Sequence, residues 1–281
     1  MAHILSFASG KGGVGKTLLC AAMGILLARQ GKKVLLIDGD MGMRNMDLVL
    51  GLENECFYHI LDLAEGKCFS EDVILWADNN LDFLPAAPSG TWADVIPAAM
   101  DTVLEDVNDR YDYIFLDCPA GVGTGIQYAA RVSEEILVVI APSWASFRNG
   151  SQLVHRVGRQ VSCRMILNQF AWKDETKVPF EDMMEQIDPD YFGGLVPYAE
   201  EADRLAHEGS LLEFSDTSAF GEALFSVMQE ILHHKEYPDH RWKQVMRKAR
   251  EENKKHQIAD EPKAVLSWHS SSAAYRWRRR R

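Results

Sequence analysis

The chain has 281 residues, of which 47% are hydrophobic and 25% charged, and its formal net charge is −11. This composition is typical of a globular protein with a sizeable core, and the acidic balance argues against a surface that coats nucleic acid. The five cysteines include no C-x-x-C pair, which gives little support to a metal or disulfide framework and favours a reducing cytoplasm. The sequence predicts neither a secretory signal peptide nor a membrane-spanning helix.

The first motif lies between a predicted strand (3–8) and a predicted helix (18–30). It reads SGKGGVGKT and satisfies the G-x-x-x-x-G-K-[ST] pattern of a phosphate-binding loop. Its glycines allow several backbone N–H groups to face one anion. We expect Lys16 to reach the β- and γ-phosphates of a nucleotide and the Thr17 hydroxyl to bind Mg²⁺. The residues expected at the nucleotide are Gly10, Lys11, Gly12, Gly13, Val14, Gly15, Lys16, Thr17 and Leu18.

Two carboxylates follow the next predicted strand, residues 34–37, whose continuous apolar run is typical of a strand buried on both faces. The carboxyl ends of such strands are where open α/β sheets bind ligands. We therefore expect Asp38 to act as an outer-shell Mg²⁺ group. Asp40 is expected to orient the attacking water or to accept its proton.

The middle of the chain alternates helical and strand patterns. Residues 54–75 predict two short helices separated by a turn, and residues 81–85 predict a strand that ends at its proline. Residues 92–109 carry an apolar stripe at helical spacing, which predicts an amphipathic helix in which Pro97 either lies near the start or bends the helix.

An acidic residue, Asp117, directly follows the apolar run 113–116. This is the Walker B arrangement, which supplies an outer-shell carboxylate for Mg²⁺. The neighbouring Cys118 is interpreted as a small buried side chain rather than a reactive thiol. Freedom of the following loop to move is expected from Gly121, Gly123 and Gly125.

The remaining elements complete an alternation of strands and helices, which predicts a doubly wound α/β P-loop domain with a mostly parallel sheet over residues 1–237. Two polar or proline positions, Asn168 and Pro197, come directly after late strands. These elements are predicted as a strand at 133–142 with a helix after it, strands at 163–167 and 193–196, and a helix at 218–234.

A second lysine, Lys11, lies five residues before Lys16, too close to the turn to reach its own phosphates easily. The K-G-G-x-G-K-T form resembles the deviant Walker A motif of the MinD/ParA ATPase family. This resemblance implies a SIMIBI-type P-loop fold that uses ATP and Mg²⁺. It also implies an ATP-state homodimer in which Lys11 completes the partner's site, so that Lys11, Lys16 and Asp40 are the expected catalytic residues.

Further motifs resemble the MinD branch of this family. The chain has its Asp-x-Asp and Gly-x-Arg-Asn-x-Asp segments and its D-x-P-A-G loop, and the family implies adenine contacts by Asn168 and Pro197. It departs from the family at Asn149 and Tyr198, where an acidic residue is usual. The matching residues are Asp38, Asp40, Gly42, Arg44, Asn45, Asp47, Asp117, Pro119, Ala120 and Gly121.

The C-terminal part has a different character. Residues 238–262 predict a charged helix, and residues 263–281 form a basic aromatic tail with one Lys, five Arg and no acidic residue. Trp and Tyr favour the membrane interface, and each basic charge contributes roughly 1 kcal/mol near anionic lipid. The tail resembles the MinD membrane-targeting segment in position but not in sequence; a nucleic-acid-binding tail and a solvated tail are the alternatives.

Taken together, the resemblance implies an ATPase that dimerises with ATP, binds the inner face of the cell membrane peripherally from the cytoplasm, and positions the division septum. Its implied partners are a MinC-like inhibitor and an ATPase-stimulating factor. A flagellar-number regulator of the same family is an alternative that shares these motifs. A ParA-type DNA-segregation ATPase is another, which the acidic composition disfavours.

Overall fold

A single sheet forms the centre of the computed structural model, which describes residues 1–171, 178, 182–183, 185–233, 244, 247–248 and 251–254. Within these residues the strand order is β3-β4-β2-β5-β1-β6-β7-β8, and every neighbouring pair is parallel except β3 and β4. This confirms the predicted doubly wound, mostly parallel sheet. The strands are β1 (His3–Ala8), β2 (Val34–Asp38), β3 (Leu75–Asp78), β4 (Leu81–Leu84), β5 (Tyr113–Asp117), β6 (Glu135–Ile140), β7 (Ser162–Phe170) and β8 (Phe192–Pro197).

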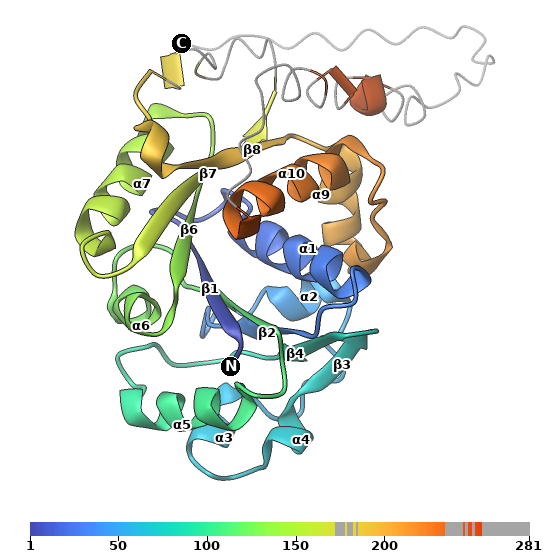
Figure 1. Cartoon of the computed structure of the whole chain (residues 1–281). Helices are drawn as coiled ribbons and strands as arrows, with labels where there is room; N and C mark the ends of the chain where they lie inside the picture. Colours follow the sequence, from blue (N-terminus) through green and yellow to red (C-terminus); the bar gives the residue numbers. More distant parts are fainter. Residues whose placement is uncertain are drawn as a thin grey trace, which may run out of the picture.

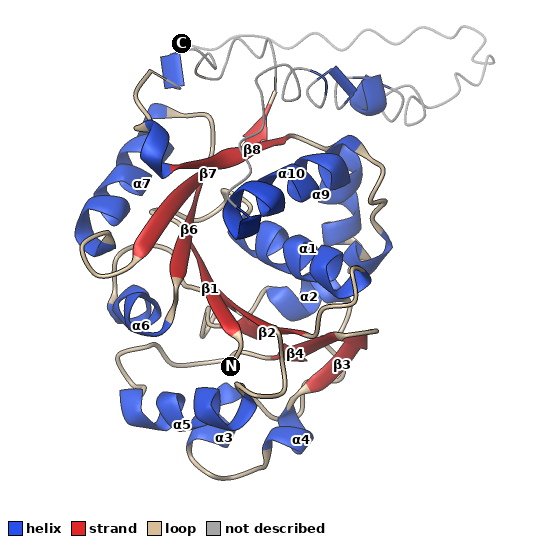
Figure 2. Ribbon diagram, in the orientation of Figure 1, coloured by secondary structure: helices blue, strands red, loops and turns tan. Residues whose placement is uncertain are grey.

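Helices cover both faces of this sheet (Figures 1 and 2). Helices α1, α2, α9 and α10 lie together on one face, and α6 and α7 lie on the other. Their bounds are α1 (Lys16–Arg29), α2 (Met46–Leu50), α3 (Ile60–Ala64), α4 (Ser70–Val73), α5 (Pro97–Val107), α6 (Thr124–Val132), α7 (Trp144–Val157), α9 (Glu200–His207) and α10 (Ala219–His233), with short 3₁₀ turns at η1 (Pro189–Tyr191) and η2 (Leu211–Glu213).

The central strands are apolar because both of their faces are covered. All residues of β2 and β6 are buried, as expected for parallel strands between two helical layers. Helix α1 is also buried along most of its length, since α10 and α2 contact it on the side away from the sheet. The first helix is thus packed on both sides, and the phosphate-binding loop leads into its N-terminus.

The register of the sheet gathers the predicted site residues at one edge. Strand β5 lies between β1 and β2, and Asp117 pairs with Phe7 of β1 and with Asp38 of β2. The carboxyl ends of three strands therefore meet at one level. The loop that follows β1 begins at the same edge, two residues beyond Phe7.

Two predicted elements differ from the structure. The second short helix of the 54–75 segment ends at Val73, and Leu75 begins strand β3, which pairs antiparallel with β4. The helix predicted over 92–109 begins only at Pro97, which occupies its first turn. Proline favours the first helical position and disfavours helical backbone in the residue before it, so residues 92–96 form a loop.

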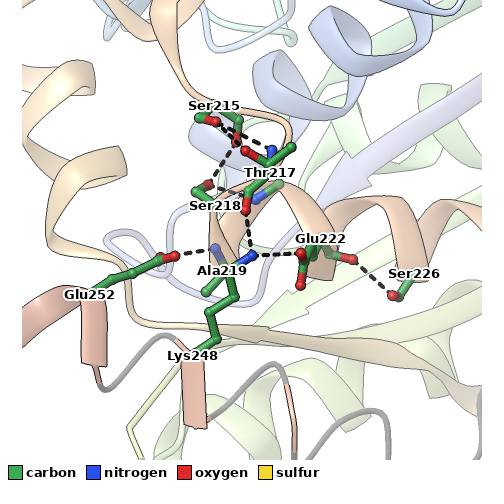
Figure 3. A network of polar contacts seen from close by, with 9 residues as sticks. Ser215, Thr217, Ser218, Ala219, Glu222, Ser226, Lys248 and Glu252 are labelled. Carbon is green, nitrogen blue, oxygen red and sulfur yellow. Dashed lines mark hydrogen bonds and ion pairs between the residues drawn. The ribbon is translucent and has the colours of Figure 1, made fainter.

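The described residues near the C-terminus cap two helices of the body. The Glu252 carboxylate accepts a hydrogen bond from the backbone N–H of Ala219 (2.9 Å), and Lys248 pairs with Glu222 at 2.6 Å (Figure 3). Asn253 accepts from the backbone N–H of Glu200 at the start of α9 (3.0 Å). Because α9 has no side-chain cap of its own, a distant segment satisfies one of its N-terminal N–H groups.

The predicted tail at 263–281 lies outside the described residues, as does most of the predicted helix at 238–262. The described residues of that helix, 244, 247–248 and 251–254, are helical. In the part of the chain that the structure describes, no helix is both long and apolar enough to cross a membrane. The division at residues 237 and 262 stays a prediction.

Candidate nucleotide-binding site

The predicted phosphate-binding loop connects β1 to α1 and has left-handed backbone at two glycines. Gly13 has a φ of 77° and Gly15, the N-cap of α1, a φ of 82°. Residues with a Cβ rarely adopt this conformation, so the sequence pattern follows from the shape of the loop. A Cβ on Gly10 would lie 2.5 Å from Cβ of Asn149, so the glycine also lets α7 approach the loop.

The side chains at the start of α1 converge on Asp117. The Lys16 Nζ atom lies 2.5 Å from one carboxylate oxygen of Asp117, and the Thr17 hydroxyl donates to the other at 2.6 Å. Lys16 is only 7% exposed and Asp117 is fully buried. Burial alone would lower the pKa of the Lys16 ammonium, but the charge and hydrogen bond of Asp117 outweigh it and raise the pKa.

The two carboxylates after β2 have different surroundings. Asp38 is fully buried and accepts hydrogen bonds from the backbone N–H groups of Asp40 (2.9 Å) and Met46 (3.1 Å). Burial, followed by the charge of Asp117, raises the pKa of Asp38 to about 7. Asp40 is half-buried, and no described group hydrogen-bonds its carboxylate; burial raises its pKa, while the charge of Lys16 opposes the rise.

These residues fit a magnesium nucleotide. A Cβ on Gly12 or Gly13 would meet no atom within 4 Å, so the loop borders open space. The buried Ser9 hydroxyl has no hydrogen-bond partner in the described part of the chain. Backbone N–H groups, an ammonium and a hydroxyl suit phosphate oxygens, and carboxylates suit the second shell of Mg²⁺. Lys16 is the residue predicted to hold the phosphates, and Thr17 is the residue predicted to hold the metal ion.

Comparison with known proteins also points to a nucleotide-binding protein. The AAA domain family model matches residues 2–166. The septum site-determining protein MinD of Synechocystis is 38% identical over 156 residues, which cover 55% of this chain and 59% of that protein. A chain of the MinC:MinD cell division protein complex of Aquifex aeolicus has a TM-score of 0.73 and 31% identity, over 84% of this chain and 98% of that one.

The chain belongs to the MinD/ParA family of P-loop ATPases. A further relative of known structure, the septum site-determining protein MinD of Pyrococcus horikoshii in complex with Mg-ADP, has a TM-score of 0.72 and 27% identity, over 82% of this chain and 96% of that one. The family predicted from the P-loop and the Asp-x-Asp segment is therefore confirmed.

In this MinD/ParA chain, Asn168 lies against the phosphate-binding loop. Its side-chain amide donates to the carbonyl oxygen of Val14 at 2.9 Å, and a Cβ on Gly15 would lie 2.4 Å from that amide nitrogen. Pro197 ends β8 at the same edge of the sheet, beside Phe170 of β7. The expected adenine contacts of Asn168 and Pro197 stay predictions.

Other residues that resemble or depart from the family pattern lie in the phosphate-binding loop, in the segment between β2 and α2, and on α7. Lys11 is exposed, and its action on the site of a second copy stays a prediction. Arg44 has a φ of 41° and pairs with Asp47 at 2.5 Å, while Asn45 precedes the first turn of α2. Asn149, where MinD-type proteins usually have an acidic residue, packs against the loop.

Sequence analysis missed one residue beside the site. Trp92 was expected on a helix, but it lies in the loop before α5 and donates to the carbonyl oxygen of Gly39 at 2.6 Å. The sequence feature that indicates a loop here is Pro97, because a proline disfavours helical backbone in the residue before it. Cys118 is buried and its burial raises the pKa of the thiol to about 12, in keeping with a packed side chain.

Proposed function

We propose that this chain is a MinD-type ATPase that binds ATP and Mg²⁺, dimerises in the ATP state, cycles on and off the membrane, and takes part in placing the division septum. The observation that carries the proposal is the convergence of Lys16, Thr17, Asp38 and Asp117 at one edge of the sheet, beside a loop that contains a second, exposed lysine.

Different residues of the site would bind the phosphates, the Mg²⁺ ion and the adenine. Lys16 and the N–H groups at the start of α1 would bind the β- and γ-phosphates, and Lys16 would leave Asp117 to do so. Thr17 would bind Mg²⁺ directly, with Asp38 and Asp117 behind it. When bound, Mg²⁺ neutralises charge that develops on the phosphate oxygens. Asn168 and Pro197 would border the adenine.

Asp40 is the group proposed to act on water. Its carboxylate is free of hydrogen bonds to described groups, lies at the site edge, and has a raised pKa. A carboxylate with such a pKa is a better base than an ordinary aspartate, and it would orient the attacking water or accept its proton. The exposed Lys11 would complete the site of a second copy, so hydrolysis would depend on dimerisation.

Dimerisation would strengthen membrane binding, because it joins two weakly binding tails in one particle. The basic aromatic tail at residues 263–281 would bind anionic lipid weakly in a monomer. Two tails in one dimer bind far more tightly, since the second contact becomes intramolecular. The MinC:MinD complex of the Aquifex aeolicus relative supports a MinC-like partner for this chain. An ATPase-stimulating factor would then end the membrane-bound state.

The test is co-sedimentation with anionic liposomes in ATP and in ADP, using the full chain and a chain that ends at Pro262. We expect ATP to bring the full chain into the pellet while the shortened chain stays in solution. Lys11→Ala serves as the matched variant, which should bind nucleotide but fail to dimerise and to sediment. A full chain that ignores lipid in both nucleotides would rule out the membrane cycle, and DNA binding would be measured next.

A further inference from the structure

Trp92 lies in the loop between β4 and α5, remote in sequence from the phosphate-binding loop. Its side chain is only 8% exposed, although the residues on both sides of it are at the surface. The indole Nε1 donates a hydrogen bond of 2.6 Å to the backbone carbonyl oxygen of Gly39. Gly39 separates the carboxylates Asp38 and Asp40, so the indole holds the backbone that joins them.

The same ring packs against the first turns of α6, the helix that follows the Asp117 loop. A Cβ on Gly125 would lie 2.7 Å from Cδ1 of Trp92, so this glycine makes room for the ring. The ring centroids of Trp92 and Tyr128 are 5.0 Å apart. One side chain therefore contacts the segment after β2 and the segment after β5.

The Gly39 peptide is fixed from two sides. Its N–H donates to the backbone carbonyl oxygen of Asp117 at 2.8 Å, while its own carbonyl accepts from Trp92. A Cβ on Gly39 would lie 2.8 Å from the Asp117 oxygen and 3.4 Å from Cζ2 of the indole. The hydrogen bond from Trp92 thus extends the contact between β2 and β5 to helix α6.

The loop that carries Trp92 is itself attached to the segment after β2. The backbone N–H of Gly42 donates to the carbonyl oxygen of Ala87 at 3.0 Å. Within the loop, Asp94 accepts from the backbone N–H and the hydroxyl of Thr91, at 2.9 and 3.0 Å. Movement of the 38–45 segment would accordingly be transmitted to the indole through two separate contacts.

We propose that Trp92 is a positioning residue that makes the Asp38–Asp40 segment and the loop after Asp117 move as one unit, so that Asp40 is aligned only when both are in place. This inference rests on the proposed ATPase function. Trp92 acts through the Gly39 peptide and does not touch the nucleotide. Its loss should therefore lower kcat and leave the KM for ATP nearly unchanged.

The first test is Trp92→Phe, which keeps an aromatic ring but removes the N–H donor. We expect kcat for ATP hydrolysis to fall about tenfold, the size expected for one lost hydrogen bond, with KM for ATP within about twofold. Trp76→Phe is the matched control, because Trp76 is 66% exposed on the edge strand β3. A Trp92→Phe protein with unchanged kcat, or with a change in KM alone, would overturn the proposal.

The second test is hydrogen–deuterium exchange on the unaltered chain with and without Mg²⁺ and a non-hydrolysable ATP analogue. Peptides from 38–48, 86–96 and 117–128 should change protection together. If the first and last respond and 86–96 does not, the coupling is wrong even if Trp92→Phe fails to fold. A chain that hydrolyses no ATP refutes the proposed activity instead, and the exchange result then decides the coupling alone.

Discussion

Both edges of the sheet bury charged side chains, but the two edges pair these charges in different ways. At the amino-terminal edge Arg164 pairs with Glu135 at 2.7 Å and donates to the carbonyl oxygens of Glu230 and Ile231 at the end of α10. This places a cation at a helix C-terminus, where it stabilises the end of the helix. The charges of this edge are therefore used within the fold.

The carboxyl-terminal edge concentrates like charges instead. Asp38 and Asp117 are buried side by side with one lysine between them and the loop, and burial raises the pKa of Asp38 to about 7. The backbone there is left-handed at Gly13 and Gly15. A buried ion pair alone thus does not mark a site. The carboxyl-terminal edge differs because its carboxylates outnumber its buried cation and lie next to a loop with left-handed glycines.

The largest effect that separates the two edges is expected for Lys16→Ala. It removes the cation that binds phosphate, so hydrolysis should fall roughly 10³-fold in a phosphate-release assay. Lys32→Ala, which removes an exposed lysine beyond the other end of α1, is the control and should keep full activity. Substantial hydrolysis by Lys16→Ala would show that the carboxyl-terminal edge is not the catalytic one.

Arg164→Leu tests the opposite edge. It leaves Glu135 buried without its cation, so the free energy of unfolding should fall by about 3 kcal/mol, measured by urea denaturation. ATP hydrolysis at a temperature where the variant is folded should stay within about twofold of the original. Loss of hydrolysis in a folded Arg164→Leu protein would contradict the division of roles between the edges.

Asp38 gives the smallest effect, one that depends on pH. Because its folded pKa of about 7 lies above the unfolded value of 3.8, the folded chain holds the proton more tightly. Its contribution to stability is present below about pH 4 and is lost as the pH rises through 7. In the absence of nucleotide, the stability of Asp38→Asn relative to the original chain should therefore increase by on the order of 2 kcal/mol from pH 5 to 7.5. Parallel pH profiles of the two proteins would refute the raised pKa.

The parts of the fold that sequence predicts well are those set by local pattern. The glycine spacing of residues 10–15 and the buried run at 34–37 depend on neighbouring residues alone, and both are found where expected. Strand β3 was missed because its four residues become a strand only by pairing with β4. An edge strand so short has no periodicity to read.

The site likewise has residues that local sequence pattern predicts and contacts that it does not. The P-loop and the aspartates were predicted because each directly follows its own strand. The hydrogen bond between Asn168 and Val14 joins residues 154 positions apart, and the contact of Trp92 with Gly39 spans 53. Such contacts depend on the order of strands in the sheet, which the sequence pattern predicts as a class but not strand by strand.

The capping of α9 and α10 by Asn253 and Glu252 has a consequence for biosynthesis. A ribosome makes both helices before it makes the residues that cap them, and domains begin to fold while synthesis proceeds. Until residues 248–253 have emerged, the nascent chain therefore lacks the hydrogen bonds that Asn253 and Glu252 accept from the starts of α9 and α10, although the Ser218 hydroxyl already accepts one from Gly221 of α10. Completion of the body is thus delayed until the segment that leads to the basic tail has been translated, which places the last folding step next to the appearance of the tail.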